Sequence, residues 1–388
     1  MSTPQLHAVA ADFLFDGSAV QRDAAVVIEG ASIAAVLPKA DLSTVVTYQL
    51  PGGAWLAPGF IDVQVNGGGD VLFNDAPTAE GLRAIVAAHR RFGTTALLPT
   101  LISDTPEKMR AALAVVDALA DSNSGVIGIH LEGPFISPER PGVHDPRYIR
   151  ALTAQDAAML TAPRKGLTHV TLAPEQVPQG FVRKLTTAGI RVSLGHSVAT
   201  YAETRAAMAE GLTGFTHLFN AMRPLGSREP GPIAAALESS DSWFGMIVDG
   251  VHVDPAMLRL ALRGLANPML VTDAMPPVGG SRSSFRLYGE EITVEAGRCL
   301  RKDGRLAGAV LDMAAAVRNC VRMLGAPLET ALRFASANPA RFLGVDDRMG
   351  RLAPGCRADM VAVDPERIGV LRTWIAGQIA DTEGRDSA

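Results

Sequence analysis

From Trp55 onward, short apolar runs alternate with segments in which apolar residues recur every three or four positions. A bounded apolar run of this kind is typical of a strand buried on both faces, and the longer spacing is typical of an amphipathic helix. The pattern therefore predicts an α/β fold of the (β/α)8 TIM-like barrel type. The eight predicted strands are FIDVQV (60–65), TALLPTL (95–101), VIGIHLEG (126–133), HVTLAPE (169–175), RVSLGHS (191–197), GFTHLFN (214–220), FGMIVDG (244–250) and PMLVTDA (268–274).

The segments between these runs have helical periodicity. AEGLRAIVAAHRRFG (79–93) places Leu82, Ile85, Val86 and His89 on one face, and Gly93 follows as a stop signal. ATYAETRAAMAEG (199–211) shows the same helical spacing of apolar residues and ends at Gly211. We expect both segments to cover the barrel from outside.

The two ends of the chain read as strands. Residues 5–50 contain apolar segments typical of strands, interrupted by turn signals at Asp16-Gly17 and Gly30. The tail after residue 349 again contains segments typical of strands. We therefore predict a small discontinuous β-sandwich domain from residues 1–54 and 349–388, with the barrel at 55–348. An insertion at about 279–306 reads as a β-hairpin near the barrel mouth.

Composition narrows the class of protein. Hydrophobic residues make up 47%, charged residues 20% and the net charge is -4, as in an ordinary globular protein, so neither nucleic acid nor a membrane is expected as a partner. Cys299, Cys320 and Cys356 are far apart and lack CxxC spacing, which disfavours a disulfide framework. The N-terminus lacks signal-peptide features and no apolar run reaches ~18 residues, so a cytoplasmic location is expected.

Four predicted strands end in a side chain that could bind a metal ion or act as a base. These residues are Glu132, His196, His217 and Asp273. Active sites of parallel barrels form at the C-terminal ends of the strands. Two histidines and a carboxylate are a common ligand set for catalytic zinc, which keeps one position open for water. A further carboxylate can be a ligand, a base or an orienter of a histidine, and the place of Asp273 at the last strand favours the base. The pattern indicates metal-assisted hydrolysis of an amide or ester.

Seven motifs occur together in this order: PGFIDVQVNG, HLEGPF, SLGHS, THLFNAM, REPG, DGVH and VTDAMPP. With them the chain resembles, over nearly its whole length, the N-acetylglucosamine-6-phosphate deacetylase family of the amidohydrolase superfamily. The resemblance implies hydrolysis of N-acetyl-D-glucosamine 6-phosphate to D-glucosamine 6-phosphate and acetate. It also implies that Glu132, His196 and His217 bind one divalent ion per subunit, expected to be zinc, and that Asp273 is the general base and acid.

The first predicted strand departs from the superfamily pattern, because Gln64 and Asn66 stand where related enzymes have a pair of histidines. One branch of the family shares this feature and resembles single-metal enzymes. The second metal position is therefore expected to be vacant, with the two amides bonding the metal-bound water or packing the barrel floor.

The resemblance also implies a set of substrate contacts. Arg228 would reach the phosphate bound in the neighbouring subunit, which implies a homodimer, and His144 would polarise the acetyl carbonyl. The other expected contacts are Val143 beside the sugar, Asn220, the Ala221 backbone and His252 at the phosphate, Asp249, Gly250 and Val251 leading to His252, and Leu306, Ala307 and Gly308 closing over the sugar.

Simpler interpretations stand beside these. Arg228 could be a solvated loop cation, and His252 could cap a helix that begins near Asp254. His7, His89 and His169 are expected to be structural, and Gly67–Gly69 a turn, because no GxGxxG context surrounds it.

Three alternative functions remain open. The first is deacetylation of the galactosamine epimer, since one hydroxyl orientation decides between the sugars. The second is a cyclic amidase such as a dihydroorotase, which usually has the histidine pair and a bridging lysine. The third is a catalytically inactive amidohydrolase-like scaffold, which would carry no metal.

Overall fold

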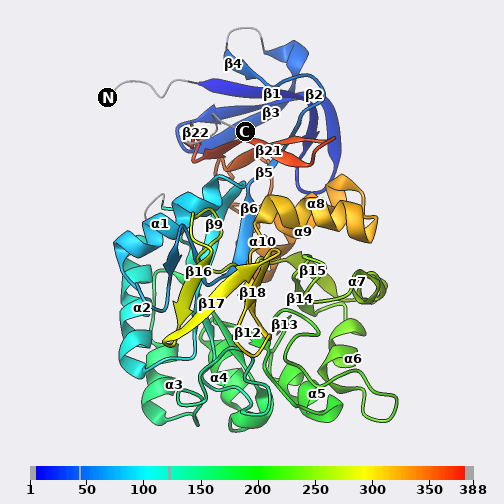
Figure 1. The fold of residues 1–388 in the computed structure, drawn as a ribbon. Helices are drawn as coiled ribbons and strands as arrows, with labels where there is room; N and C mark the ends of the chain where they lie inside the picture. The colour runs from blue at the N-terminus through cyan, green and yellow to red at the C-terminus, as the bar shows by residue number, and fades with distance from the viewer. Residues whose placement is uncertain (1–5, 43–44, 121–123, 381–388) are drawn as a thin grey trace. The chain divides into compact units, whose positions relative to one another are not determined.

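The computed structural model describes residues 6–42, 45–120 and 124–380 (Figure 1). The chain forms two compact units. One comprises Met1–Asp62, Ala87–Ala96 and Asp312–Ala388, and the other comprises Val63–Val86 and Leu97–Leu311. The domain limits expected from the sequence stay a prediction.

The first unit is built on a sheet from both ends of the chain. Strand β20 (Met360–Asp364) pairs antiparallel with β5 (Trp55–Pro58), so the tail rejoins the N-terminal strands as predicted. The strand order is β22-β21-β20-β5-β1-β2-β3, and β4 pairs with β1 beside β5. The remaining strands are β1 (His7–Phe15), β2 (Val20–Glu29), β3 (Ser32–Pro38), β4 (Val46–Gln49), β21 (Gly369–Ile375) and β22 (Gln378–Ile379).

This sheet buries one apolar cluster, which includes Val26, Leu56 and Trp374. The same unit also contains the helices α8 (Met313–Leu324), α9 (Leu328–Ala335) and α10 (Ala337–Leu343). Helix α8 begins where the Asp312 side chain accepts a hydrogen bond from the Ala315 amide and ends at Gly325, whose φ is 74°. Both are ordinary helix-end signals.

The second sheet is the predicted barrel. Its eight strands run in the order β15-β14-β13-β12-β11-β10-β9-β6, and a parallel bridge from Val65 to Ala274 brings its ends together. The eight-stranded α/β barrel is thus confirmed. The strands are β6 (Phe60–Val65), β9 (Thr94–Ile102), β10 (Gly128–Glu132), β11 (Leu167–Leu172), β12 (Arg191–Leu194), β13 (Gly214–Phe215), β14 (Trp243–Met246) and β15 (Asn267–Leu270).

Several barrel strands end earlier than the apolar runs predict. β13 has only two residues, although the run continues to Asn220. The reason is visible in the backbone, because His196, His217 and Asp273 have φ of 50°, 33° and 49°. A residue in this left-handed region leaves the strand conformation. His196, His217 and Asp273 therefore lie just after their strands, whereas Glu132 is the last residue of β10.

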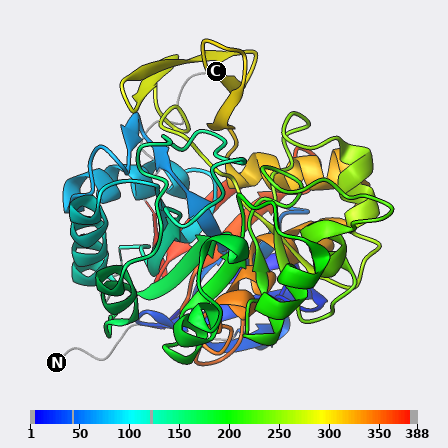
Figure 2. The same cartoon turned by 90° about the horizontal axis from the view of Figure 1, so that it is seen from below.

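Helices lie outside the strands, as Figure 2 shows. Helix α1 (Ala79–Arg90) buries Leu82, Ile85, Val86 and His89, in agreement with the predicted face. The other barrel helices are α2 (Pro106–Leu119), α3 (Ala154–Thr161), α4 (Phe181–Thr187), α5 (Tyr201–Ala209), α6 (Gly231–Leu237) and α7 (Pro255–Ala261). Short 3-10 turns occur at Lys39–Asp41 and Pro174–Gln176.

The insertion is larger than the predicted hairpin. It is a four-stranded antiparallel sheet of β16 (Ser284–Leu287), β17 (Glu290–Glu295), β18 (Arg298–Leu300) and β19 (Leu306–Ala309), yellow in Figure 2. Leu306, Ala307 and Gly308 belong to its last strand, not to a segment beyond it. The insertion packs Leu287 and Ile292 with Ile102 and Met275 in one apolar cluster, and this packing lets two further strands form.

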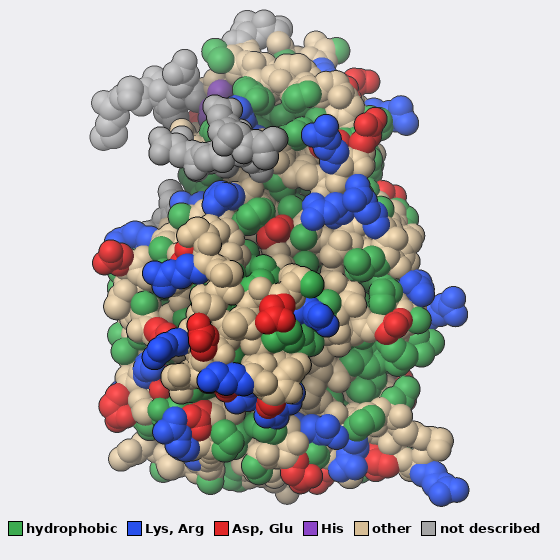
Figure 3. All heavy atoms as spheres, viewed as in Figure 1, with side chains coloured by type: hydrophobic (Ala, Val, Ile, Leu, Met, Phe, Trp, Pro, Cys, Tyr) green, Lys and Arg blue, Asp and Glu red, His purple; other side chains and the backbone are tan. Residues whose placement is uncertain are grey.

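The expected turn at Gly67–Gly69 is instead a small hairpin of β7 (Gly67–Gly68) and β8 (Val71–Leu72). The three cysteines are buried and unbridged. Among the described residues, no helix has both the length and the apolar character needed to cross a bilayer. On the face drawn in Figure 3, basic and acidic side chains are interspersed.

Candidate functional site

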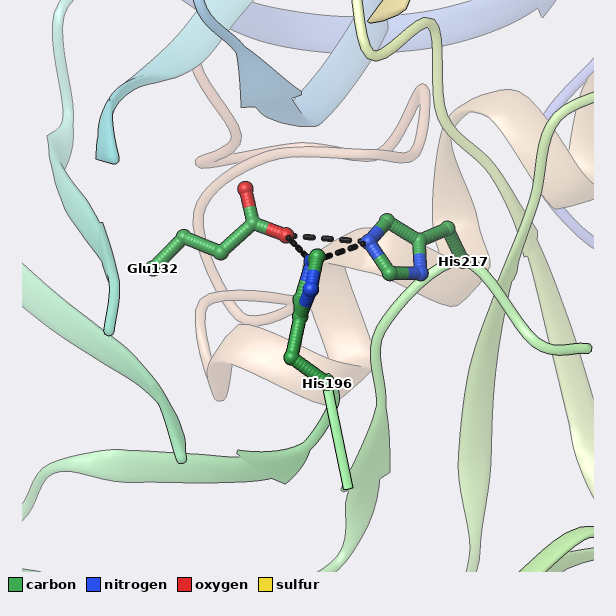
Figure 4. Close-up of side chains that lie close together, drawn as sticks. All are labelled: Glu132, His196 and His217. Carbon is green, nitrogen blue, oxygen red and sulfur yellow. Dashed lines mark hydrogen bonds and ion pairs between the residues drawn. The ribbon is translucent and has the colours of Figure 1, made fainter. Parts of the chain in front are cut away.

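Three side chains converge at the C-terminal ends of barrel strands β10, β12 and β13 (Figure 4). Glu132 Oε1 lies 2.9 Å from His217 Nε2 and 3.1 Å from His196 Nε2, and the two imidazole nitrogens are 3.1 Å apart. All three residues are buried. The sequence placed them on three separate strands, and the fold brings their ligand atoms to one point.

This triangle fits a small divalent ion. Ligands about 2.0–2.1 Å from a tetrahedral ion lie about 3.3 Å from one another, close to the observed separations. The Nδ1 atom of His196 lies 2.8 Å from the Arg140 carbonyl oxygen, which orients the ring so that Nε2 faces the other two ligands. Three protein ligands leave a coordination position open, as in catalytic zinc sites.

The charges of the triangle depend on one another. Burial alone would raise the pKa of Glu132, but hydrogen bonds to His196 and His217 outweigh it and hold this pKa well below its usual value. Burial alone would lower the pKa of His217, but its hydrogen bond to Glu132 and the negative charge of that carboxylate raise it. The carboxylate is therefore ionised and available as a ligand.

Asp273 lies beside the triangle, held by the two amides of the first strand. Asn66 Nδ2 donates to Asp273 Oδ1 at 2.6 Å, and Gln64 Nε2 donates to the same oxygen at 3.2 Å. Gln64 Nε2 is also 3.4 Å from both oxygens of Glu132. The two amides thus connect the carboxylates, and the vacancy of a second metal position stays a prediction.

The environment of Asp273 suits a base. Burial and the charge of Glu132 raise its pKa to about 6, against the opposing effects of His217, His252 and the Asn66 hydrogen bond. A carboxyl group with a pKa near neutrality can both accept and return a proton.

The triangle and Asp273 open into a cavity of about 180 Å³. Of the residues predicted from the sequence, those that line it are Asn66, Glu132, Val143, His144, His196, His217, Asn220, Ala221, His252, Asp273, Leu306 and Gly308. Ile102, Ile247 and Met275 add an apolar wall. A mostly apolar cavity with a few convergent polar groups is typical of a small-molecule site.

The predicted contacts that do not line this cavity are Asp249, Gly250, Val251, Ala307 and Arg228. Asp249 accepts hydrogen bonds from the His252 ring, at 2.6 Å, and from the His252 amide. Ala307 is buried in the apolar cluster of the insertion. Helix α7 is capped by the Asp254 side chain, which accepts from the Ala256 amide, so His252 is not its cap. Asp249 thus contributes to the cavity indirectly, because it holds the His252 ring, which lines the cavity.

Arg228 is exposed in the loop between β13 and α6 and does not line the cavity of this chain. No hydrogen bond or ion pair joins its guanidinium to any residue in the described part of the chain. Its placement agrees both with a solvated cation and with a role at a neighbouring subunit.

The sequence prediction did not include Ser103 and Tyr288. The Ser103 amide donates to His144 Nδ1 at 3.2 Å, its hydroxyl lies 2.7 Å from the same atom, and Tyr288 donates to the Ser103 carbonyl oxygen at 2.5 Å. The rule about strand ends, extended to TALLPTLI, would have identified Ser103. Tyr288 lies in the insertion and had no comparable signal.

Comparisons with known proteins agree with this geometry. The amidohydrolase family model matches residues 55–383. An N-acetylgalactosamine-6-phosphate deacetylase from a Shewanella species is 42% identical over 86% of this chain and 84% of its own length. The N-acetylglucosamine-6-phosphate deacetylase of Haemophilus influenzae is 37% identical over 92% of this chain and 95% of its own.

Two solved structures have the same fold along almost the whole chain. N-acetylglucosamine-6-phosphate deacetylase from Pasteurella multocida has a TM-score of 0.93 at 34% identity, covering 96% of this chain and 99% of its own. A mutant of the Mycobacterium smegmatis enzyme in complex with N-acetyl-D-glucosamine 6-phosphate has a TM-score of 0.90 at 35% identity, covering 97% and 100%. The chain therefore belongs to the amidohydrolase family.

Proposed function

We propose that the protein hydrolyses N-acetyl-D-glucosamine 6-phosphate to D-glucosamine 6-phosphate and acetate. The observation that carries the proposal is the convergence of Glu132, His196 and His217 beside Asp273 in one cavity. The deacetylase relatives, similar along nearly the whole chain, support the choice of substrate.

Glu132, His196 and His217 would hold one divalent ion, and zinc suits this set of nitrogen and oxygen donors. When bound, such an ion polarises a carbonyl group and makes a water molecule more acidic. Asp273 takes the proton of the attacking water on the carboxylate that Asn66 and Gln64 orient. The same carboxyl group then protonates the departing amine nitrogen, and His144 donates a hydrogen bond to the acetyl carbonyl oxygen.

The cavity also supplies substrate contacts. His252, fixed by Asp249, and Asn220 with the Ala221 backbone would bind the phosphate end. Val143, Leu306 and Gly308 would lie against the sugar. In this arrangement the amide of the sugar phosphate would be directed at Asp273, which lines the same cavity.

A homodimer with Arg228 at the neighbouring phosphate is part of this proposal. The support is its exposed guanidinium, which has no bonded partner among the described residues. Coexpression of Arg228→Ala with Asp273→Asn tests it. Mixed dimers should regain one complete site and part of the activity, whereas a wholly intramolecular site would give no recovery.

The first experiment measures acetate release from the glucosamine substrate before chelation, after chelation, and after zinc is restored to about one equivalent. We expect release to disappear and to return at one equivalent. A folded protein that releases no acetate under any metal loading would refute the deacetylase proposal. Reproducible absence of metal would favour a scaffold.

The galactosamine epimer is a second candidate substrate, because a deacetylase for it is 42% identical to this chain. The comparison of kcat/KM for the two sugar phosphates decides between them. A kcat/KM ratio above about 10 corresponds to more than about 1.4 kcal/mol of discrimination in the transition state.

A further inference from the structure

Ser103 follows strand β9 and meets one nitrogen of His144 through two groups. Its backbone N–H donates to His144 Nδ1 at 3.2 Å, and its hydroxyl oxygen lies 2.7 Å from that atom. A side-chain hydroxyl can rotate, but a backbone N–H cannot turn away from its acceptor. Nδ1 therefore carries no proton, and the proton of the neutral imidazole lies on Nε2.

The opposite nitrogen is available to the substrate. His144 lines the catalytic cavity, and no hydrogen bond joins its Nε2 to any residue of the described chain. The ring is 2% exposed and packs edge-on against His196, with 4.5 Å between ring centroids, so its orientation is fixed. The geometry leaves a single N–H donor for an incoming carbonyl oxygen.

Ser103 is itself held in place from several directions. Tyr288, contributed by the insertion, donates to its carbonyl oxygen, and Asn74 bonds both the amide and the carbonyl of the preceding Ile102. Gly133 makes room for the hydroxyl, because a Cβ there would lie 2.3 Å from Ser103 Oγ at a φ of +81°. Three separate segments therefore meet at this serine.

We infer that Ser103, held by Tyr288, is the positioning residue that fixes the tautomer and direction of His144 and so presents an Nε2–H donor to the acetyl carbonyl. The inference rests on the proposed function, which assigns His144 to that carbonyl. It gives the inserted sheet a role in catalysis, since Tyr288 connects the sheet to the donor through one serine.

The main test combines kinetics with a spectrum of the histidines. In ¹⁵N-histidine-labelled full-length protein loaded with zinc, His144, assigned by its absence in His144→Gln, should show an unprotonated Nδ1 and a protonated Nε2. Ser103→Ala keeps the backbone N–H that sets the tautomer and removes only the hydroxyl that helps to direct the ring, so Nδ1 should stay unprotonated. The loss of the hydroxyl should lower kcat by about 10-fold, the range found for residues that orient a functional side chain, and change KM less than about twofold. Tyr288→Phe should have the same effect to a smaller degree.

A matched serine provides the control. Ser193 bonds the buried His169 at 2.6 Å, a similar contact outside the cavity, so Ser193→Ala should lose stability without a tenfold loss of kcat. A second pair tests the donor directly. His144→Gln places an amide near the Nε2 position and should retain more activity than His144→Asn, whose amide is nearer Nδ1.

A protonated Nδ1 on His144, wild-type kcat in Ser103→Ala, or equal activity of the Gln and Asn variants would overturn the inference. These outcomes are distinct from failure of the proposed function. A wild-type protein that releases no acetate refutes the reaction, whereas the histidine spectrum reports the tautomer whether or not turnover occurs.

Discussion

The molecule contains two groups of buried histidines. One is the cavity group, His196 and His217 with Glu132; the other is the interior pair, His130 and His169, on adjacent strands β10 and β11. The rings of the interior pair stack at 4.1 Å and bond hydroxyl groups, among them Thr171 Oγ1 at 2.7 Å from His130. The residue types are the same, but the partners differ.

Those partners determine what each group can do. Burial lowers the pKa of His130 to about 4, so its ring is neutral. Each of its two nitrogens is hydrogen-bonded to a threonine hydroxyl. In the cavity group a carboxylate and two Nε2 atoms converge on one point beside a cavity. Burial alone does not make a histidine a ligand; convergence with a carboxylate, with space beside it, does.

The largest effect is expected from removing that carboxylate. Glu132→Gln should lose the metal and reduce acetate release by more than about 10³-fold, because two histidines without a carboxylate no longer form the ligand set. Metal analysis after dialysis, together with kcat/KM, measures this. Retention of one equivalent of metal would mean that Glu132 is not a ligand.

The next largest effect separates metal binding from proton transfer. Asp273→Asn should keep the metal at the wild-type level and lower kcat by about 10²–10⁴-fold, because the amide cannot accept the proton of the attacking water. Metal content and initial rates on the same preparation provide the measurement. Turnover near that of the wild type would remove Asp273 from the proposed role.

The pH dependence of kcat/KM tests the role of Asp273 as the base. Asp273 must be ionised to act as a base, so activity should be present above its pKa and fall tenfold per pH unit below it. Burial and Glu132 raise this pKa to about 6, and a bound dication adds positive charge that lowers it. The acid limb of log kcat/KM should therefore have its midpoint at or below about pH 6. A midpoint clearly above pH 6 would assign the limb to another group.

The sequence predicted the cavity group but not everything that supports it. Glu132, His196, His217 and Asp273 could be identified because each follows a local apolar run and barrels gather strand ends on one face. Glu132 ends its strand as predicted, but His196, His217 and Asp273 lie beyond theirs, since their left-handed backbones are not part of a strand.

The missing parts depend on contacts distant in sequence. Tyr288 bonds Ser103 across 185 positions, and the insertion that delivers Tyr288 is a four-stranded sheet with no sequence signal for its packing. The stacking of His130 on His169 depends on the register of two strands, which the period of each strand alone does not set.

The smallest effect on activity is expected in the interior pair, and it tests the comparison most directly. Thr171 Oγ1 lies 2.7 Å from His130 Nε2 and 2.6 Å from Thr216 Oγ1, so Thr171→Val keeps the shape but leaves two buried polar groups without this partner. Each unsatisfied group costs about 1–3 kcal/mol, and the free energy of unfolding should fall by an amount of that order.

Because no atom of Thr171 lines the cavity, metal content should be unchanged and kcat should stay within about twofold. Denaturant unfolding and initial rates measure both quantities. If kcat fell as steeply as in Asp273→Asn while the protein remained folded, the interior pair would be part of the catalytic machinery, and the distinction between the two histidine groups would no longer hold.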